Sequence, residues 1–170
     1  MTLSNRWVGL SKGKRLALVV WVTAILVACS GDRHIELADG GELRLDAQQV
    51  LVINYWAKWC KPCLHEIPEL NRLNKNTGIT VIGIDFDKHQ GQELNSLIAQ
   101  MKIEFPVLAG QHEPKHIHPE LTRKAQALPM TYLMLVPSPE SGKGIRLSKA
   151  LLGPQTEDGL LGKIKQFQGQ

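Results

Sequence analysis

The feature that most restricts the fold of this chain is a pair of cysteines, Cys60 and Cys63, placed where a strand gives way to a helix. The nearly continuous apolar run 51–57 before the pair predicts a buried strand. From residue 60 to about residue 75, apolar positions recur at helical spacing. Two cysteines three positions apart on a first helical turn face the same side, so a disulfide between them is feasible. The chain therefore needs a fold in which a strand delivers two thiols to the start of a helix.

The remaining elements indicate the fold class. Two short strands within 35–45, around the Gly-rich turn 38–41, predict a hairpin. Further strands are expected at 80–86, 131–136 and 146–152, helices at 92–101, 120–127 and 156–167, and a helix end at Gly78. Strand and helix alternate through the middle of the chain, and two strands adjoin near its end. This order predicts an α/β fold with a mixed central sheet flanked by helices on both faces and an N-terminal β-hairpin.

The first 28 residues have the pattern of an export signal. Basic residues precede the apolar run 16–28, which spans about 20 Å as a helix. A bilayer core of about 30 Å needs about 20 residues, so the run suits a signal peptide better than the alternative, an uncleaved anchor. This leader accounts for the net charge of +4, and the rest of the chain carries 16 basic and 16 acidic residues. The balance of charge argues against nucleic acid as a partner.

The leader ends in Leu26-Val27-Ala28-Cys29, which resembles the lipobox of bacterial lipoproteins. In that family the signal is cut before the cysteine, which then carries the lipid. The resemblance implies a lipoprotein signal peptide at 1–28, a short tether at 29–33 and a folded domain at 34–170. It also implies an extracytoplasmic, membrane-anchored protein, and Ser30 after the modified Cys29 favours the outer membrane. Lipidation would also account for the third cysteine, because an unpaired thiol is a liability in an oxidising compartment.

The two other cysteines are expected to have different roles. Cys60 stands at the helix amino terminus, where free N–H groups and the helix dipole favour an anion, so its thiolate should form at lower pH than that of a free cysteine. Cys63 lies one turn further in and would attack the mixed disulfide formed by Cys60. Lys61 adds a positive charge beside the pair. The alternatives are a static disulfide or half of a metal site, although a metal site would usually need a second pair of ligands.

The run Tyr55-Trp56-Ala57-Lys58-Trp59-Cys60-Lys61-Pro62-Cys63 resembles the active-site signature of the thioredoxin family. Pro68 matches the helix-kinking proline of that family, and Leu128-Pro129-Met130-Thr131 resembles its cis-proline loop. The early hairpin, Asn54 and Glu66 are more similar to its membrane-tethered branch, the TlpA/ResA-like thiol-disulfide oxidoreductases. The resemblance covers roughly residues 33–168. It implies a thioredoxin-like fold and an enzyme that exchanges disulfides with protein thiols and needs neither cofactor nor metal.

The resemblance also implies which residues contact the substrate. In the family the cis proline lies against the cysteine pair, and the backbone before it pairs with the substrate chain. Pro129 is therefore a predicted catalytic residue, and Leu128 and Met130 are predicted substrate contacts. An ordinary turn proline is the alternative for Pro129, because cis forms are only about 5–6% of X–Pro bonds. Trp59 is expected to flank the attacking cysteine, while Trp56 is assigned mostly to the core.

Glu66 is the predicted proton relay. Cytoplasmic thioredoxins carry a buried Asp where this chain has Asn54, and an amide cannot take a proton. Glu66 lies three residues after Cys63, on the same helical face, and is the acid of the TlpA/ResA-like branch. We expect desolvation to raise its pKa and allow it to relay the proton of Cys63. The alternative is a solvated helix charge.

The resemblance favours a reductase that receives electrons from a membrane donor. The motif leaves the direction open, because reduction potentials in this superfamily span about −270 to −120 mV, and a disulfide-forming oxidase is the enzymatic alternative. A copper- or metal-binding delivery module is the alternative of another class, with the cysteine pair and the loop from His112 to His118 as ligands. A solvated loop is favoured there, because metal sites need second-shell support that a short loop rarely provides.

Overall fold

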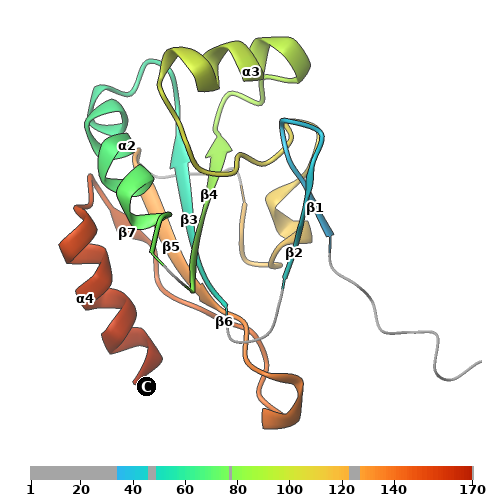
Figure 1. The fold of residues 1–170 in the computed structure, drawn as a ribbon, viewed down its shortest axis with the longest axis vertical. Coiled ribbons are helices and arrows are strands. Elements are labelled where there is room, and N and C mark those ends of the chain that lie inside the picture. The colour runs from blue at the N-terminus through green and yellow to red at the C-terminus, as the bar shows by residue number, and fades with distance from the viewer. Residues whose placement is uncertain (1–33, 46–48, 77, 123–126, 170) are drawn as a thin grey trace, which may run out of the picture. The chain divides into compact units, whose positions relative to one another are not determined.

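The centre of the structure is a mixed sheet of five strands in the order β4-β3-β5-β6, with β7 also paired to β5 (Figure 1). β3, Val50–Trp56, is buried along its whole length because both faces of the sheet are covered. It pairs in parallel with β4, Ile79–Asp85, and antiparallel with β5, Met130–Leu135. β6, Arg146–Leu147, and β7, Leu151–Leu152, pair with the other edge of β5. The computed structural model describes residues 34–45, 49–76, 78–122 and 127–169.

Three α-helices cover one face of this sheet. α2, Lys61–Leu73, follows β3, and α3, Gly91–Gln100, follows β4. α4, Glu157–Gln168, is the last element of the chain. All three contribute buried side chains to one core, which also contains Val52 of β3 and Val81 of β4. This core holds both cysteines of the pair, so packing of the helices on the sheet fixes the position of the disulfide.

The amino-terminal part of the described chain is the predicted β-hairpin. β1, His34–Glu36, and β2, Glu42–Arg44, pair antiparallel. Gly40 in the turn has a φ of 84°, a left-handed conformation that glycine adopts without strain. A hydrogen bond from Ala38 N to Val107 O attaches the hairpin to the neighbouring backbone.

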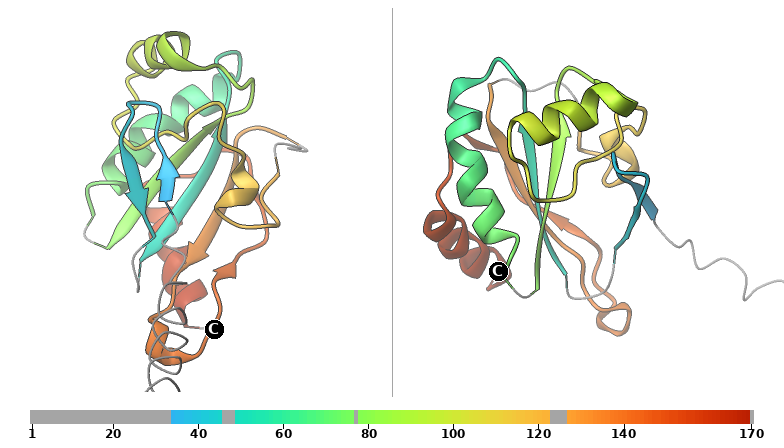
Figure 2. Two further views of the ribbon diagram at one scale, coloured as in Figure 1. Left: turned by 90° about the vertical axis from the view of Figure 1, so that its right-hand side faces the viewer. Right: turned by 45° about the horizontal axis from the view of Figure 1, so that its top comes forward.

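Among the described residues no α-helix lies on the second face of the sheet, and residues 123–126 of the helix expected at 120–127 lie outside them. The hairpin and the 3-10 helix Pro114–His116 lie on this side, with α2 behind the sheet (Figure 2, left). The reason lies in the connections. The β3–α2–β4 connection and the connection from β4 through α3 to Val107 are both parallel and continue in the same direction, since Gly83 of β4 bridges Val107 in parallel. Right-handed connections of this kind place their helices on the same face.

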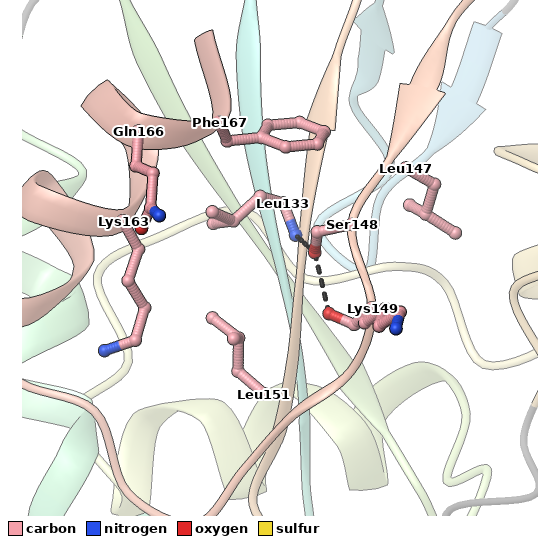
Figure 3. Close-up of a pocket in the computed structure, with 8 residues that line it drawn as sticks. All are labelled: Leu133, Leu147, Ser148, Lys149, Leu151, Lys163, Gln166 and Phe167. Carbon is pink, nitrogen blue, oxygen red and sulfur yellow. Dashed lines mark hydrogen bonds between the residues drawn. The ribbon is translucent and has the colours of Figure 1, made fainter. Parts of the chain in front are cut away.

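The predicted strand 146–152 is divided into β6 and β7. Ser148 interrupts it, because its Oγ accepts a hydrogen bond from Leu133 N (2.9 Å) and donates one to Lys149 O (2.9 Å) (Figure 3). Beside this interruption lies a hollow of about 500 Å³ between α4 and the sheet. The eight side chains in Figure 3 line it, and none of them belongs to the segments that carry the cysteines or the cis proline. Its residues are Leu133, Leu147, Ser148, Lys149, Leu151, Lys163, Gln166 and Phe167.

Two predicted helix boundaries need correction, and the predictions for the amino-terminal leader lie outside the described residues. α2 is capped by Asn74 and not by Gly78, which has a φ of 83° and precedes β4. Of the helix predicted at 120–127, residues 120–122 and 127 are not helical and the others lie outside the described residues. The leader, the tether and Cys29 lie outside them too. Within the described ranges, no helix combines the length and the apolar character needed to span a bilayer.

Candidate active site

The cysteine pair occupies the start of α2, as predicted. β3 ends at Trp56, and a turn closed by a bond from Cys60 N to Ala57 O (3.1 Å) leads into the helix. Cys60 is the N-cap residue, and its Sγ accepts a hydrogen bond from Cys63 N (3.3 Å). The two sulfurs form a disulfide, with the Cα atoms 5.3 Å apart. Cys60 is 4% exposed and Cys63 is 1% exposed, so Cys63 is the more enclosed of the two.

The surroundings of Cys60 favour a negative charge on its sulfur. The first turn of α2 contains no acidic residue, and its N–H groups converge on the cap position. Lys58 and Lys61, on either side of Cys60, are exposed. A helix amino terminus without acidic neighbours is an environment that favours a thiolate over a thiol.

Glu66 is buried, with 1% of its surface exposed, which excludes the alternative of a solvated helix charge. Its Oε2 accepts a hydrogen bond from Asn54 Nδ2 (3.2 Å), and its Oε1 accepts one from Gln155 N (3.0 Å). Burial raises the pKa of Glu66 to about 7, although hydrogen bonds from Gln155, Asn54 and Thr131 act to lower it. At neutral pH this carboxyl group can therefore both accept and release a proton.

Asn54 connects Glu66 to β5. Its Nδ2 also donates a hydrogen bond to Thr131 Oγ1 (3.0 Å), and the two residues face each other in the β3–β5 register. Both side chains are buried. Asn54 cannot take a proton, but it fixes the position of one carboxylate oxygen of Glu66.

The peptide bond between Leu128 and Pro129 is cis, as predicted. β5 begins directly after Pro129, with Met130 opposite Tyr55 near the end of β3. This register places the cis-proline loop at the end of the sheet from which Cys60 emerges. The two other predicted substrate contacts in this loop differ in exposure. Leu128 is half-buried, whereas the side chain of Met130 is buried in the core of the second face.

Trp59 lies on the surface beside the disulfide. It is 63% exposed, whereas Trp56 is fully buried and belongs to the core, as expected. The indole Nε1 of Trp59 donates a hydrogen bond to Asp87 Oδ2 (3.0 Å), and its ring lies edge-on to Phe86 with the centroids 6.5 Å apart. The loop after β4 therefore holds Trp59 in place next to Cys60.

The large exposed apolar residues of the described chain are all close in sequence or register to the site. They are Trp59, Leu64 and Leu152. Leu64 follows Cys63 directly, and Leu152 pairs with Met130 after the cis proline. These three are the large apolar side chains that the described chain leaves exposed, and exposed apolar groups are common where another protein binds.

Two of the histidines between His112 and His118 pack against each other, and one of them lies against the hairpin. The rings of His112 and His116 pack edge to face, with centroids 4.9 Å apart. His112 Nδ1 also lies 3.8 Å from Glu36 Oε2. No set of three ligand atoms that could share an ion includes these residues within the described ranges.

A set of three candidate ligands does occur in the loop after β4. Oxygen and nitrogen atoms of Asp85, Asp87 and His89 lie within 4.8 Å of one another and could hold a cation. Asp85 Oδ2, however, accepts a hydrogen bond from His89 N (2.7 Å) and lies 2.8 Å from His89 Nδ1. Its Oδ1 accepts one from Asp87 N (3.3 Å). The buried carboxylate therefore closes the loop that carries Asp87.

Sequence reasoning missed three residues of this site. Thr131 and Gln155 bond to the buried acid network, and Asp87 anchors Trp59. The sequence indicated Thr131 only as the last residue of the cis-proline motif and predicted no bond from it to the acid network. Gln155 acts through its backbone N–H, which every non-proline residue has, so no residue type could have indicated it.

Comparisons with known proteins agree with this geometry. The model of the AhpC/TSA family matches residues 30–133. The thiol-disulfide oxidoreductase ResA of Bacillus anthracis is 29% identical over 118 residues, which are 68% of this chain and 61% of that relative. The thiol:disulfide interchange protein HelX of Rhodobacter capsulatus is 28% identical over 116 residues, 68% of this chain and 59% of that relative. The match thus spans about three fifths of the length of these relatives.

Solved structures show the same fold. A thiol:disulfide interchange protein of the thioredoxin family from Chlorobium tepidum TLS superposes with a TM-score of 0.59 at 20% identity. The superposition covers 79% of this chain and 92% of that chain. The predicted thioredoxin-like fold, with its mixed sheet and N-terminal hairpin, is confirmed.

Proposed function

The chain belongs to the AhpC/TSA family, and on that premise we propose that it is a thiol-disulfide oxidoreductase acting on protein cysteines. One observation carries this proposal: the Cys60–Cys63 disulfide begins the helix that also buries Glu66, an acid whose pKa is raised to about 7. A static disulfide does not need an ionisable group in the core, where burial of a carboxyl costs free energy. A redox pair does, because exchange proceeds through thiolates and a proton must leave each thiol.

The reaction in the reducing direction has two displacements. The Cys60 thiolate attacks one sulfur of the substrate disulfide, so a Cys60–substrate S–S bond forms as the substrate S–S bond breaks and the first substrate thiolate leaves. Cys63 then attacks Cys60 Sγ, which forms the Cys60–Cys63 disulfide and releases the second substrate sulfur. Two electrons pass from the dithiol to the substrate, and the two protons of the dithiol end on the substrate thiols.

Glu66 takes the proton of Cys63 in the second displacement. A general base acts best when its pKa is near the working pH, and a pKa of about 7 meets that condition. The proton then passes to the departing substrate thiolate, and Glu66 is ready for the next cycle. Asn54 and Gln155 hold the carboxyl group in place by hydrogen bonds to its two oxygens.

The substrate is a protein segment that docks over the disulfide. The exposed side chains of Trp59, Leu64 and Leu152, each adjacent in sequence or strand pairing to the cysteine pair or the cis-proline loop, support this assignment, because exposed apolar groups favour binding of another chain. The cis-proline loop, with Pro129 and the backbone of Leu128, supplies the edge along which the substrate segment lies.

We favour reduction over oxidation as the direction, by resemblance to the TlpA/ResA-like branch. The electrons then come from a dithiol donor in the membrane. The lipobox-like sequence ending in Cys29 supports export and a lipid anchor, so that the domain works on the extracytoplasmic side, with Ser30 favouring the outer membrane.

The first test is turnover of insulin disulfides by cysteine variants. Cys60→Ser should abolish turnover while the fold is retained, because no thiolate remains to attack. Cys29→Ser is the matched control and should leave turnover of the detergent-solubilised protein unchanged. Insulin reduction by Cys60→Ser at the wild-type rate would refute the proposal.

The second test is the direction of electron flow. Equilibration of the Cys60–Cys63 pair against glutathione gives its reduction potential. A reductase should lie near the thioredoxin value of about −270 mV, whereas a value near about −120 mV would favour the oxidase.

A further inference from the structure

A chain of hydrogen bonds runs from the buried acid to the cis-proline loop through the segment between β7 and α4. We call this segment, residues 153–155, the strap. Gln155 N donates to Glu66 Oε1 (3.0 Å), and Gln155 Nε2 donates to Gly153 O (2.8 Å). Gly153 N in turn donates to Pro129 O (2.9 Å). The strap therefore bonds at one end to the carboxyl group and at the other end to the cis proline itself.

A second path leads from the other carboxylate oxygen of Glu66 to β5, the strand that directly follows Pro129. Asn54 Nδ2 donates to both Glu66 Oε2 (3.2 Å) and Thr131 Oγ1 (3.0 Å). Thr131 is two residues after Pro129 on the same segment. Together the two paths close a ring of hydrogen bonds and backbone. Gln155 makes two bonds in this ring, one from its backbone N–H to Glu66 and one from its side chain to Gly153.

We propose that Gln155 is a positioning residue that couples the proton of Glu66 to the cis-proline loop, so that the buried acid and the substrate-binding edge respond together. The proposal rests on the proposed function for its consequence in catalysis, but the coupling itself is a property of the chain without substrate.

The physical basis is the difference between a charged and a neutral acceptor. A hydrogen bond to an ionised carboxylate is roughly twice as strong as one to a neutral group. When Glu66 loses its proton, its bond from Gln155 N tightens, and the strap transmits this change to Gly153 and Pro129. The side chains bonded to Glu66 are neutral. The charged groups nearby on α2 and α4 are Glu69, Arg72 and Glu157, which bond to one another.

Amide chemical shifts of the oxidised full-length chain test the coupling. With the disulfide intact, Cys60 and Cys63 do not titrate. His65 is the neighbour of Glu66 on α2, so the part of the movement that Glu66→Gln removes is the part assigned to Glu66. The amide resonances of Gly153 and Thr131 should both move with pH, with midpoints near 7 that match the Glu66 carboxyl resonance. In Gln155→Met, which has a similar length but no donor, the movement of Gly153 should fall at least about twofold, while that of Thr131 persists.

Three further variants complete this experiment. Glu66→Gln should remove both movements, and Gln100→Met, at the exposed end of α3, should leave both intact. Gln155→Glu, which lacks a donor when ionised, is a second variant and should also reduce the movement of Gly153. A wild-type Gly153 resonance that does not follow Glu66, or one that follows it equally in both Gln155 variants, would overturn the proposal.

Turnover gives the consequence in catalysis. For a peptide disulfide, Gln155→Met should raise KM by about 2- to 10-fold, the worth of one net hydrogen bond, with little change in kcat. If wild type shows the coupling but no turnover, the proposed function fails and the coupling stands. If wild type turns over and the Gly153 resonance ignores Glu66, this inference fails alone.

Discussion

Glu66 is the residue whose environment departs furthest from what a carboxyl group prefers. It is surrounded by the core rather than by water, and the free energy that burial costs is offset only in part by its hydrogen bonds. The same burial that destabilises its charged form gives it a pKa suited to proton transfer at neutral pH. A carboxyl group is thus kept in the core at the expense of folding stability.

This cost should be measurable as a pH dependence of stability. Between the ordinary pKa of 4.5 and the folded value of about 7, the native state holds a proton that the unfolded state has lost. The free energy of unfolding should therefore fall as pH rises through this window, by about 3 kcal/mol in total. Urea unfolding at pH 5 and pH 8 measures the change. Glu66→Gln should lack this part of the dependence, and a variant with the wild-type pH profile would contradict the assignment.

Trp59 offers a second prediction at this scale. Because its side chain is 63% exposed, Trp59→Ala should change the free energy of unfolding little. Its loss should lower kcat/KM for a protein disulfide by about 10-fold, the usual effect of removing an aromatic anchor from an interface. A small aromatic disulfide reagent serves as the control substrate, and equal losses for both substrates would place Trp59 in the chemistry and not in docking.

Residue types with a chemical signature were predictable from the sequence, and residues that act through the backbone were not. The cysteine pair and Glu66 were identified by spacing and by resemblance. Gln155 escaped because its bond to Glu66 comes from a main-chain N–H, 89 positions away along the chain.

At the scale of elements, β4 approaches its neighbours so closely that it needs a glycine. A Cβ added at Gly83 would come within 2.9 Å of both Phe105 Cε2 and Trp56 Nε1, and within 3.3 Å of Val107 Cγ2. These neighbours are buried and cannot move aside freely. The strand beside β3 therefore depends on this position for its packing.

Two glycine variants test this packing. Gly83→Ala should lower the free energy of unfolding by about 1–3 kcal/mol, the usual cost of overpacking. Gly162→Ala, at an open position in α4, should instead raise it by about 0.5–1 kcal/mol through helix propensity. Denaturant titration measures both, and a neutral Gly83→Ala would contradict the close packing.

α4 provides a further prediction through its N-cap. Thr156 accepts a hydrogen bond from Gly159 N (3.2 Å) at the start of the helix, directly after the strap. Thr156→Ala should lower the free energy of unfolding by about 1 kcal/mol, because the cap hydrogen bond is lost. Thr156→Ser keeps the hydroxyl group and should lower the free energy of unfolding much less. Equal losses in the two variants would show that the hydroxyl group is not the stabilising feature.

Elements with strong periodicity were predicted well, and those without it were not. β3 is apolar except for Asn54, and α2 has a clear apolar stripe, so both appear within a residue or two of their expected bounds. The strand expected at 146–152 is interrupted at Ser148, whose Oγ accepts a hydrogen bond from Leu133 N that no periodicity reveals. The helix expected at 120–127 had little apolar pattern to support it.

At the scale of the whole molecule, the fold brings two other segments of the chain to the carboxyl group of Glu66. Glu66 on α2 bonds to Asn54 on β3 and to Gln155 before α4. The mixed character of the sheet was predictable from the alternation of strands and helices and the two adjoining strands near the end of the chain. The order of its strands was not predicted. The placement of α2 and α3 on the same face was not predicted either, because it depends on the direction in which successive parallel connections cross the sheet.

The central claim is that Cys60 is the attacking sulfur of a redox pair and Cys63 its shielded partner. Alkylation of the reduced full-length protein with iodoacetamide between pH 5 and 9, with the labelled cysteine mapped by mass spectrometry, tests it most directly. We predict that Cys60 reacts first, at a pH clearly below the pKa of about 8.5 of a free cysteine, and that Cys63 reacts only after unfolding. Equal labelling of the two cysteines, or a Cys60 inert up to that pH, would contradict the account.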